Sequence, residues 1–441
     1  MAALPFPILT ITIISIFNNL ESIVPEFEGN RYFSENYLLT GYRPLINTAD
    51  IEKFIKNILN RYNDAGFPFC SITPEFISID SITKKLVLHI SEGERVIIRD
   101  YIFKTDGKTE SAPLRKIAHI RKDKYFSLRS INQLKKALLK TGVFTSINEY
   151  ILKKDDNYFL ILEFKEKSSD NIMVSGSFAE FNNYLTVNLS SINIFGSLRQ
   201  FLFRYESSIG SENNKRLFQL SFTEPVVLHP VSFNTELSMW TYDSTGLTKL
   251  DGTFIAPLNN SVSIFISSGI EITNYLTDTG SFNYTHSVIK IGLQSEYYTN
   301  HFVNTNRISF DYLFRENKKW RIKYDGTIMY ANFFVKPHFC LVITDNFEYF
   351  DYIRLGGANS LRGYMEDELL AKKTFWINLE YKLLSIYPLI DIALTDNDYK
   401  YSYGIGIDAK TNLTDASIIF AWPENGKLHD GKVHLLLEKA F

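Results

Sequence analysis

Near its C-terminal end the chain reads Arg354-Leu-Gly-Gly-Ala-Asn-Ser-Leu-Arg-Gly-Tyr364, and the acidic run Met365-Glu-Asp-Glu368 follows directly. The stretch lies between two segments that read as β-strands. Its paired glycines permit left-handed or tightly folded backbone, and Arg362 offers a planar, permanently charged fork that fits carboxylates. The sequence therefore predicts a loop that folds toward a specific partner, and the strands around it decide the fold.

The segments on both sides of this loop alternate apolar and polar residues with a period of two, as strands do. About eleven strand candidates precede the loop from about residue 171 onward, and about five follow it, a spacing that fits tilted membrane strands. The C-terminal part therefore predicts an antiparallel β-barrel of about 16 strands, although a soluble β-sandwich would show the same period. The alternation is clearest in Thr374 to Leu383, where one face carries Phe375, Ile377, Leu379, Tyr381 and Leu383.

The composition suits a strand-rich protein with more than one domain. The 441 residues are 45% hydrophobic and 15% aromatic, and strands and membrane-interface belts both favour aromatic residues. Because no run of about 18 apolar residues occurs, a membrane location would require a β-barrel rather than a helix. The formal net charge of -2 predicts no general attraction to nucleic acid.

Two units of similar pattern precede the barrel, and each reads β-α-α-β-β. The first helix begins after Thr48, a plausible N-cap, and ends at Asp64-Ala-Gly66, where glycine suits the C-terminal cap. The second unit has a helical stretch that ends at Thr141-Gly142 and a hairpin that turns at Lys154-Asp-Asp-Asn157. The expected domains are a possible, imperfect signal segment in 1–20, the two units in 21–93 and 94–168, and the barrel in 169–441.

These features together resemble the outer-membrane assembly-factor superfamily, which includes BamA, TamA and the two-partner secretion transporters. The Arg362-Gly-Tyr364 segment is similar to the inward-folded loop of that family. The resemblance implies α+β periplasmic POTRA domains followed by a transmembrane antiparallel β-barrel. The segments that look like POTRA signatures are Phe27-Glu-Gly-Asn30, Tyr62-Asn-Asp-Ala-Gly-Phe67, Ser91-Glu-Gly93 and Thr141-Gly-Val-Phe144.

The alternation turns Glu380 and Asp391 toward the lumen on neighbouring strands, because their sequence neighbours form the apolar faces. The resemblance implies that Arg362 pairs with both carboxylates and fixes the loop inside the barrel, since Asn378-Leu-Glu-Tyr381 and Leu389-Ile-Asp-Ile392 match the family strands. Ala393 stands where the family often has glycine. The alternative is a surface loop with solvated charges. The expected lock comprises Arg362, Gly363, Tyr364, Gly356, Gly357, Glu380 and Asp391.

The first and last barrel strands are expected to meet in a lateral seam. They run from about Ile172 to Phe181 and from Lys432 to Phe441. The terminal aromatic resembles the signal that outer-membrane insertion machinery reads, although Lys439 departs from it. The residues expected at the seam are Ile172, Val174, Val433, Leu435, Leu437 and Phe441.

No catalytic constellation is evident in the chain. Cys70 and Cys340 are the two cysteines, and their separation gives neither a disulfide framework nor a metal spacing. The eight histidines form no metal-binding pair, and neither a nucleophile elbow nor a phosphate-binding loop occurs. We therefore expect no enzymatic activity, no cofactor and no metal.

The resemblance implies an outer-membrane factor for the assembly, insertion or translocation of other proteins. Client polypeptides would bind at the POTRA strand edges and at the lateral seam, with the POTRA domains in the periplasm. The implied partners are unfolded outer-membrane or secreted clients, accessory lipoproteins and outer-membrane lipid. The alternative is a two-partner secretion pore that exports a dedicated partner protein. Arg362-Gly-Tyr364 and the lack of a carboxylate-rich cluster argue against a passive porin or a barrel enzyme.

Overall fold

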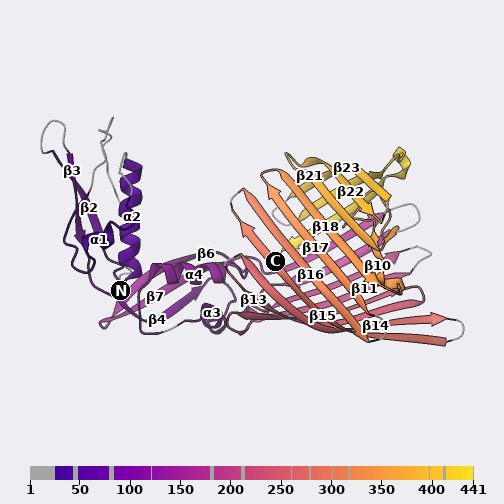
Figure 1. Ribbon diagram of the computed structural model, residues 1–441, viewed down its shortest axis with the longest axis horizontal. Coiled ribbons are helices and arrows are strands. Elements are labelled where there is room, and N and C mark those ends of the chain that lie inside the picture. The colour runs from indigo at the N-terminus through magenta and orange to yellow at the C-terminus, as the bar shows by residue number, and fades with distance from the viewer. Residues whose placement is uncertain are drawn as a thin grey trace. The chain divides into compact units, whose positions relative to one another are not determined.

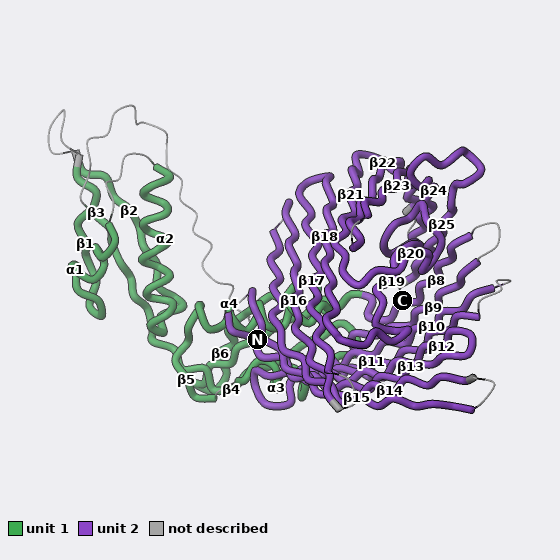
Figure 2. Tube along the Cα trace, turned by 45° about the vertical axis from the view of Figure 1, so that its right-hand side comes forward, with its two compact units in different colours: residues 1–167 green, residues 168–441 purple. Residues whose placement is uncertain are grey.

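The computed structural model describes residues 25–42, 48–78, 84–120, 122–178, 183–209, 214–259, 261–277, 280–299, 301–315, 318–396, 398–410 and 414–440. The chain forms two compact units, residues 1–167 and residues 168–441 (Figure 1, Figure 2). The signal segment predicted in residues 1–20 lies outside the described residues. Within the described ranges, no helix combines the length and the apolar character needed to cross a membrane.

The first unit begins with a three-stranded sheet and one long helix. Strand β3 lies between β1 and β2, parallel to β1 and antiparallel to β2. The helix ends two residues before Gly66, whose φ of +107° favours glycine. The elements are β1 (Glu26–Glu28), α1 (Glu35–Leu38), α2 (Thr48–Asp64), β2 (Ser71–Ser78) and β3 (Lys84–Ser91).

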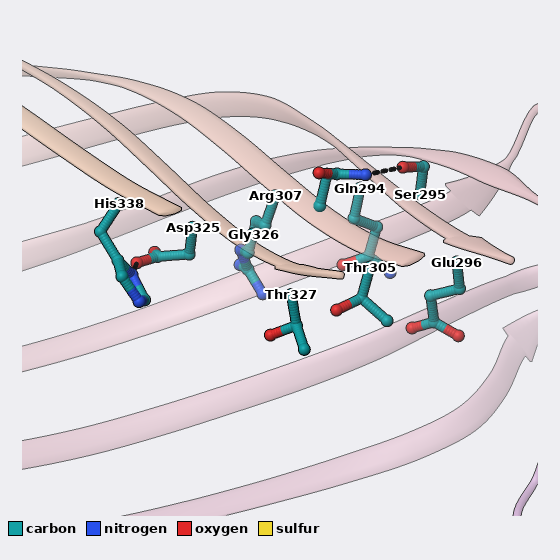
Figure 3. Close-up of a pocket in the computed structure, with 10 residues that line it drawn as sticks. Gln294, Ser295, Glu296, Thr305, Arg307, Asp325, Gly326, Thr327 and His338 are labelled. Carbon is teal, nitrogen blue, oxygen red and sulfur yellow. Dashed lines mark hydrogen bonds and ion pairs between the residues drawn. The ribbon is translucent and has the colours of Figure 1, made fainter. Parts of the chain in front are cut away.

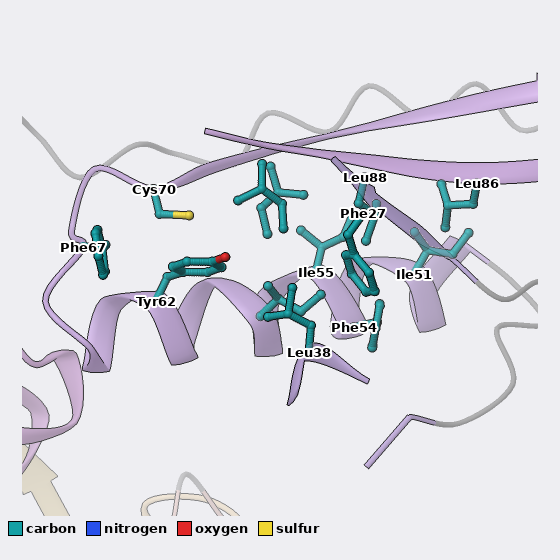
Figure 4. Close-up of a cluster of buried hydrophobic side chains, with 13 residues drawn as sticks. Phe27, Leu38, Ile51, Phe54, Ile55, Tyr62, Phe67, Cys70, Leu86 and Leu88 are labelled. Atoms are coloured by element: carbon teal, nitrogen blue, oxygen red, sulfur yellow. The ribbon is translucent and has the colours of Figure 1, made fainter. Parts of the chain in front are cut away.

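This sheet and α2 enclose a core of apolar side chains (Figure 4). Ile55, Ile58 and Tyr62 repeat at helical spacing and are almost fully buried, so they form one face of α2. They belong to the same buried cluster as Leu86 and Leu88, which alternate along β3. The apolar face of the helix, repeating every 3.6 residues, and the apolar face of the strand, repeating every two residues, therefore pack against each other.

Replacing Ile55 with alanine is expected to lower the stability of this part by about 2–5 kcal/mol, because the fully buried side chain would leave a cavity. Hydrogen exchange of the full-length chain should then become faster along α2 and β3. Ile77→Ala is the matched control, since Ile77 on the edge strand β2 is 40% exposed and should tolerate the change. Equal exchange rates in the two variants would contradict the assigned core.

The second part of this unit contains a four-stranded sheet in the order β5-β4-β7-β6, with β4 parallel to β7. The order of its elements follows the predicted scheme except for β5, an added strand of only two residues. A strand this short carries almost no periodic signal, so the sequence did not predict it. The elements are β4 (Ile97–Thr105), α3 (Ser111–Ala118), β5 (Lys124–Tyr125), α4 (Leu128–Leu139), β6 (Phe144–Lys154) and β7 (Asn157–Glu166).

The second unit is a closed antiparallel barrel of 16 strands, as predicted, and the closure excludes the β-sandwich alternative. Eleven of the strands precede the glycine-rich loop and five follow it. The strands are β8 (Asp170–Phe178), β9 (Asn183–Ser191), β10 (Gln200–Ile209), β11 (Lys215–Leu228), β12 (Val231–Tyr242), β13 (Thr245–Pro257), β14 (Val262–Thr277), β15 (Gly280–Tyr298), β16 (Phe302–Arg315), β17 (Lys319–Tyr330), β18 (Phe333–Thr344), β21 (Lys373–Tyr381), β22 (Ile386–Thr395), β23 (Asp398–Lys410), β24 (Asp415–Pro423) and β25 (Lys432–Ala440).

The barrel strands alternate between an exposed outer face and a lumen-facing side. On β22, Ile390 and Leu394 are 47% and 52% exposed, whereas Asp391 and Ala393 are fully buried. Asp391 lies opposite Asn378 of β21, so the two residues share the inner face. The apolar outer face and the polar inner face are the pattern of a barrel whose outside meets lipid.

Candidate functional site

Residues 345–372, between β18 and β21, form a segment that we call the lumen loop. Its base is a short hairpin of β19 (Ile353–Leu355) and β20 (Leu369–Ala371). A 3-10 turn, η2 (Tyr349–Asp351), precedes β19. Two other such turns, η1 (Ile194–Gly196) and η3 (Leu428–Asp430), lie between barrel strands. The hydrogen bonds of the lumen loop run to inward-facing side chains of several barrel strands, which places the loop inside the barrel.

The first anchor of the lumen loop is Arg362, which is 3% exposed. Its Nε and NH2 donate to the two carboxylate oxygens of Asp391 at 2.9 and 2.6 Å, and its backbone N–H donates to Asp391 at 2.9 Å. NH1 donates to Glu380 Oε1 at 2.5 Å. The structure therefore brings together the three charged residues of the expected lock, in the fork geometry that suits guanidinium and carboxylate.

Two neutral groups complete the site around Asp391. Asn378 Nδ2 donates to Asp391 Oδ1 at 2.7 Å and also to the backbone carbonyl of Ser360. Ser402 on β23 donates to Asp391 Oδ2 at 3.2 Å. These side chains satisfy lone pairs that the guanidinium leaves open, which a buried charge requires. The sequence prediction missed both, although the same alternation places them on the inner face.

The three glycines of the expected lock lie where the chain makes close backbone approaches. Gly356 and Gly357 have φ of +119° and +82°, a region that side chains disfavour. A Cβ on Gly356 would lie 1.9 Å from the carbonyl oxygen of Met365, inside the loop itself. Gly363 instead faces the wall, where a Cβ would lie 2.4 Å from the backbone of Trp422 on β24.

The aromatic residue of the expected lock contributes apolar packing. Tyr364 is 7% exposed and shares a buried cluster with Leu355, Leu361 and the wall residue Ala393. Its hydroxyl lies 3.3 Å from the carbonyl oxygen of Tyr401 and donates to it. Ala393 of the barrel wall therefore contacts the lumen loop through this cluster.

Gly363→Ala is expected to push the tip of the lumen loop away from β24, because the neighbouring atoms are backbone and cannot rotate aside. The destabilisation should be about 1–3 kcal/mol, seen as a lower temperature at which the folded, heat-modifiable band is lost on gels. Gly246→Ala on β13 is the control, because a Cβ there would meet its nearest atom, the Trp240 carbonyl oxygen, at an ordinary contact distance of 3.7 Å. Loss of the band at the same temperature in wild type and Gly363→Ala would argue against close packing at this point.

A second anchor, which the sequence did not predict, holds the start of the lumen loop. Asp351 of η2 is 3% exposed and accepts hydrogen bonds from Lys319 at 2.7 Å and Arg321 at 3.3 Å. Arg321 also donates to both oxygens of Glu271 on β14, at 2.7 and 2.9 Å. Lys319 is 3.0 Å from Glu348 as well. The buried cations of β17 are therefore compensated partly by the wall and partly by the loop.

A third anchor holds the acidic run that follows Arg362. Asp367 lies 2.7 Å from Lys215 Nζ on β11, and the same amine is 3.1 Å from Glu206 on β10. Lys215 is 9% exposed, so the charges meet in a largely dry site. The three anchors lie on β11, on β17 and on β21 with β22, which are separate parts of the barrel wall.

The seam strands are paired in this structure. Strand β25 hydrogen-bonds to β8 in antiparallel register and thereby closes the barrel. The predicted first strand reached Phe181, but β8 ends at Phe178, and residues 179–182 lie outside the described residues. Phe441 lies outside them too. The register sets Ile172 opposite Lys439, Val174 opposite Leu437, Gly176 opposite Leu435 and Phe178 opposite Val433.

Comparison with known proteins rests on structure alone, because no family model and no curated protein sequence matches the chain. BamA from Haemophilus ducreyi lacking POTRA domains 1-3 matches with a TM-score of 0.61 at 14% identity, over 96% of this chain and 100% of that chain. CdiB from Acinetobacter baumannii matches with a TM-score of 0.62 at 12% identity, over 99% and 93%. CdiB from Escherichia coli gives 0.59 at 12%, over 100% and 94%.

This chain has a BamA-type barrel fold. CdiB shares that fold to the same degree, so the likeness describes architecture and leaves the choice between the two proteins open. The 16 paired strands of the BamA-type barrel agree with the number that the sequence predicted.

The wall of the BamA-type barrel also carries an open cavity of about 260 Å³ on β15 to β18 (Figure 3). Arg307, Asp325 and His338 are among its lining residues, and His338 Nδ1 lies 2.8 Å from the Asp325 carboxylate. Hydroxyl and amide side chains make up most of the remaining lining. None of the residues predicted for the site lines this cavity. Its polar lining makes this part of the barrel wall hydrophilic.

The described residues contain no group of three His, Cys, Asp or Glu side chains placed to hold a metal ion. Cys70 is buried in the core of the first unit, and Cys340 is half-buried on β18. Burial, with a smaller effect of nearby Glu92, raises the pKa of the Cys70 thiol to about 12. This thiol therefore stays protonated and unreactive at neutral pH.

Proposed function

We propose that the chain is an outer-membrane factor that assists the insertion or translocation of client polypeptides. The observation that carries the proposal is the lumen loop, held by Arg362 against Asp391 and Glu380 inside a closed BamA-type barrel. A loop docked inside the barrel, together with a seam of two strands that a client strand could enter, suits a protein that binds and moves other polypeptide chains.

We propose that residues 21–93 and 94–168 are POTRA-like domains in the periplasm. Within the described residues, each of their sheets ends in a strand with one unpaired edge, β2 of eight residues and β6 of 11 residues. Such edges pair with extended chains by β-augmentation. Unfolded clients would add a strand there and then at the seam between β8 and β25.

The proposed mechanism has no catalytic step, nucleotide or cofactor. Backbone hydrogen bonds offered by a strand edge stabilise an extended client, and the folding of the client makes the process favourable. Outer-membrane lipid surrounds the apolar outer face of the barrel. Accessory lipoproteins remain proposed partners of the first unit.

A second candidate function is a pore that exports one dedicated secreted partner. It is supported by the likeness to CdiB, a two-partner secretion transporter, whose TM-scores bracket that of BamA. In this case the lumen loop would act as a plug that leaves the lumen during export. The stretch before the first POTRA-like domain, where a plug helix would lie, is outside the described residues.

Reconstitution of the full chain into liposomes tests the proposal. A urea-unfolded eight-stranded barrel protein serves as the probe, and its heat-modifiable, protease-protected form is followed over time. We expect faster insertion than into empty liposomes, and slower insertion with Arg362→Ala. The export alternative predicts uncatalysed insertion but transfer of an unfolded secreted polypeptide across the bilayer. If neither insertion nor transfer exceeds that of empty liposomes, both functions are wrong.

A further inference from the structure

One residue of the last strand touches both the lumen loop and the first strand. His434 faces the lumen from β25 and is 5% exposed. Its Nε2 lies 2.7 Å from the backbone carbonyl oxygen of Arg362. Its Nδ1 is hydrogen-bonded to the hydroxyl of Ser177, which lies directly opposite on β8. A single imidazole thus links three segments that are far apart in the sequence.

The chemistry of the ring makes these two contacts complementary. A carbonyl oxygen can only accept, so Nε2 must carry the proton that it donates to Arg362. In the neutral ring Nδ1 is then an acceptor, and the Ser177 hydroxyl supplies the matching donor. Both buried nitrogens are therefore satisfied by one tautomer. Loss of either partner would leave one buried ring nitrogen without its hydrogen bond. The ring would then be held less firmly, and its other hydrogen bond would be weakened.

The neighbourhood strengthens the link between the loop tip and the seam. Arg362 is fixed on its other side by Asp391, so its carbonyl cannot move without disturbing the first anchor. The next residue, Gly363, packs against the backbone of Trp422 on β24, the strand that pairs with β25. The loop tip is thus attached to the strand pair on one side of the seam.

We infer that His434 couples the docking of the lumen loop to the closure of the β8–β25 seam. Separation of the strands breaks the Ser177 contact, and release of the loop breaks the Arg362 contact. Each event therefore makes the other easier, which is a coupling free energy between two sites. The inference rests on the proposed function, because that function requires the seam to open. The coupling itself is a property of this chain and does not require a client.

Hydrogen exchange of the full-length protein in lipid nanodiscs tests the coupling without a client. Amides of β8 and β25 report seam opening, and amides of residues 353–364 report loop docking. His434→Leu should accelerate exchange in both regions by roughly three- to tenfold, the effect of losing one or two hydrogen bonds. Arg362→Ala should accelerate both regions as well, but should add nothing at the seam when His434 is already leucine.

A matched control removes a different cross-seam contact. Asn171 of β8 donates to Glu438 of β25, farther along the same strand pair from His434. Asn171→Ala should accelerate exchange locally, at that end of the seam. Because this change leaves the Ser177–His434 contact in place, the lumen loop should keep its wild-type exchange rate. The contrast separates loss of a seam contact from loss of the link to the loop.

Two conservative variants separate the two hydrogen bonds of the His434 ring. They also keep the test informative if His434→Leu does not fold. His434→Gln keeps a donor at the reach of Nε2 and should free mainly the seam. His434→Asn keeps an acceptor near Nδ1 and should free mainly the loop.

The inference is overturned if Arg362→Ala accelerates exchange in the loop while β8 and β25 exchange at the wild-type rate. It is also overturned if the effects of Arg362→Ala and His434→Leu on exchange at the seam are additive. Because the exchange experiment contains no client, its result is independent of the liposome insertion assay, so a failure of the coupling and a failure of the proposed function can be told apart.

Discussion

Replacement of Arg362 with alanine is expected to release the tip of the lumen loop and to cause the largest loss of stability of any single change considered for the barrel. Asp391 and Glu380, fully buried and 8% exposed, would lose the guanidinium that compensates them. Breaking a buried ion pair by removing one partner costs roughly 3–5 kcal/mol. The measurement is the temperature at which the folded band of the membrane-extracted protein is lost, together with protease cleavage within residues 353–371.

Two variants of arginine control this result. Arg362→Lys keeps the charge but loses the fork that binds both oxygens of Asp391, so it should be intermediate. Arg216→Ala removes an exposed arginine near the start of β11 and should change neither the band nor the cleavage. If Arg362→Ala retains the wild-type temperature and a protected loop, the buried ion pairs do not hold the loop.

Replacement of Asp351 with alanine is expected to free the start of the lumen loop while its tip stays docked. Lys319 and Arg321, 1% and 5% exposed, would lose an acceptor in a site from which water is largely excluded. The cost should fall at the lower end of roughly 3–5 kcal/mol, because Lys319 keeps Glu348 and Arg321 keeps Glu271. Hydrogen exchange should become faster in residues 346–353 and change less in residues 356–364.

Asp345→Ala is the matched control for this change, since Asp345 is an exposed carboxylate at the start of the same loop. It should leave the exchange of residues 346–353 at the wild-type rate. Equal acceleration by the two variants would mean that the loop start depends on overall charge rather than on the contacts of Asp351.

The barrel could be predicted from the sequence because its determinants are local. A period of two is visible within each strand, and a count of such segments gave eleven strands before the loop and five after it. The same alternation turns Glu380 and Asp391 inward, which is where the structure has them. A sequence motif supplied their partner, because it names Arg362 without any need to know the register.

The other two anchors could not be predicted, because their partners are distant and carry no motif. Arg321 lies 50 residues from Glu271 and 30 from Asp351. Alternation says that such a residue faces the lumen, but many charged residues do so, and only the barrel's curvature selects the pairs. His434 was missed for the same reason: its contact with Arg362 spans 72 residues and involves a backbone carbonyl, which no side-chain pattern reports.

Chemical crosslinking tests most directly the central claim that the loop is docked on the inner wall of a closed barrel. Ser360→Cys and Asn378→Cys, in a background with Cys70→Ser and Cys340→Ser, are treated in native membranes with a short bifunctional thiol reagent. Asn378 Nδ2 contacts the Ser360 carbonyl, so we expect a crosslink within the folded, heat-modifiable species. Ile390→Cys, outward-facing and 47% exposed, should not crosslink to residue 360. The claim would be contradicted by a folded protein with an accessible loop. In that case the thiol introduced by Ser360→Cys would crosslink to neither position and would react freely with an impermeant maleimide.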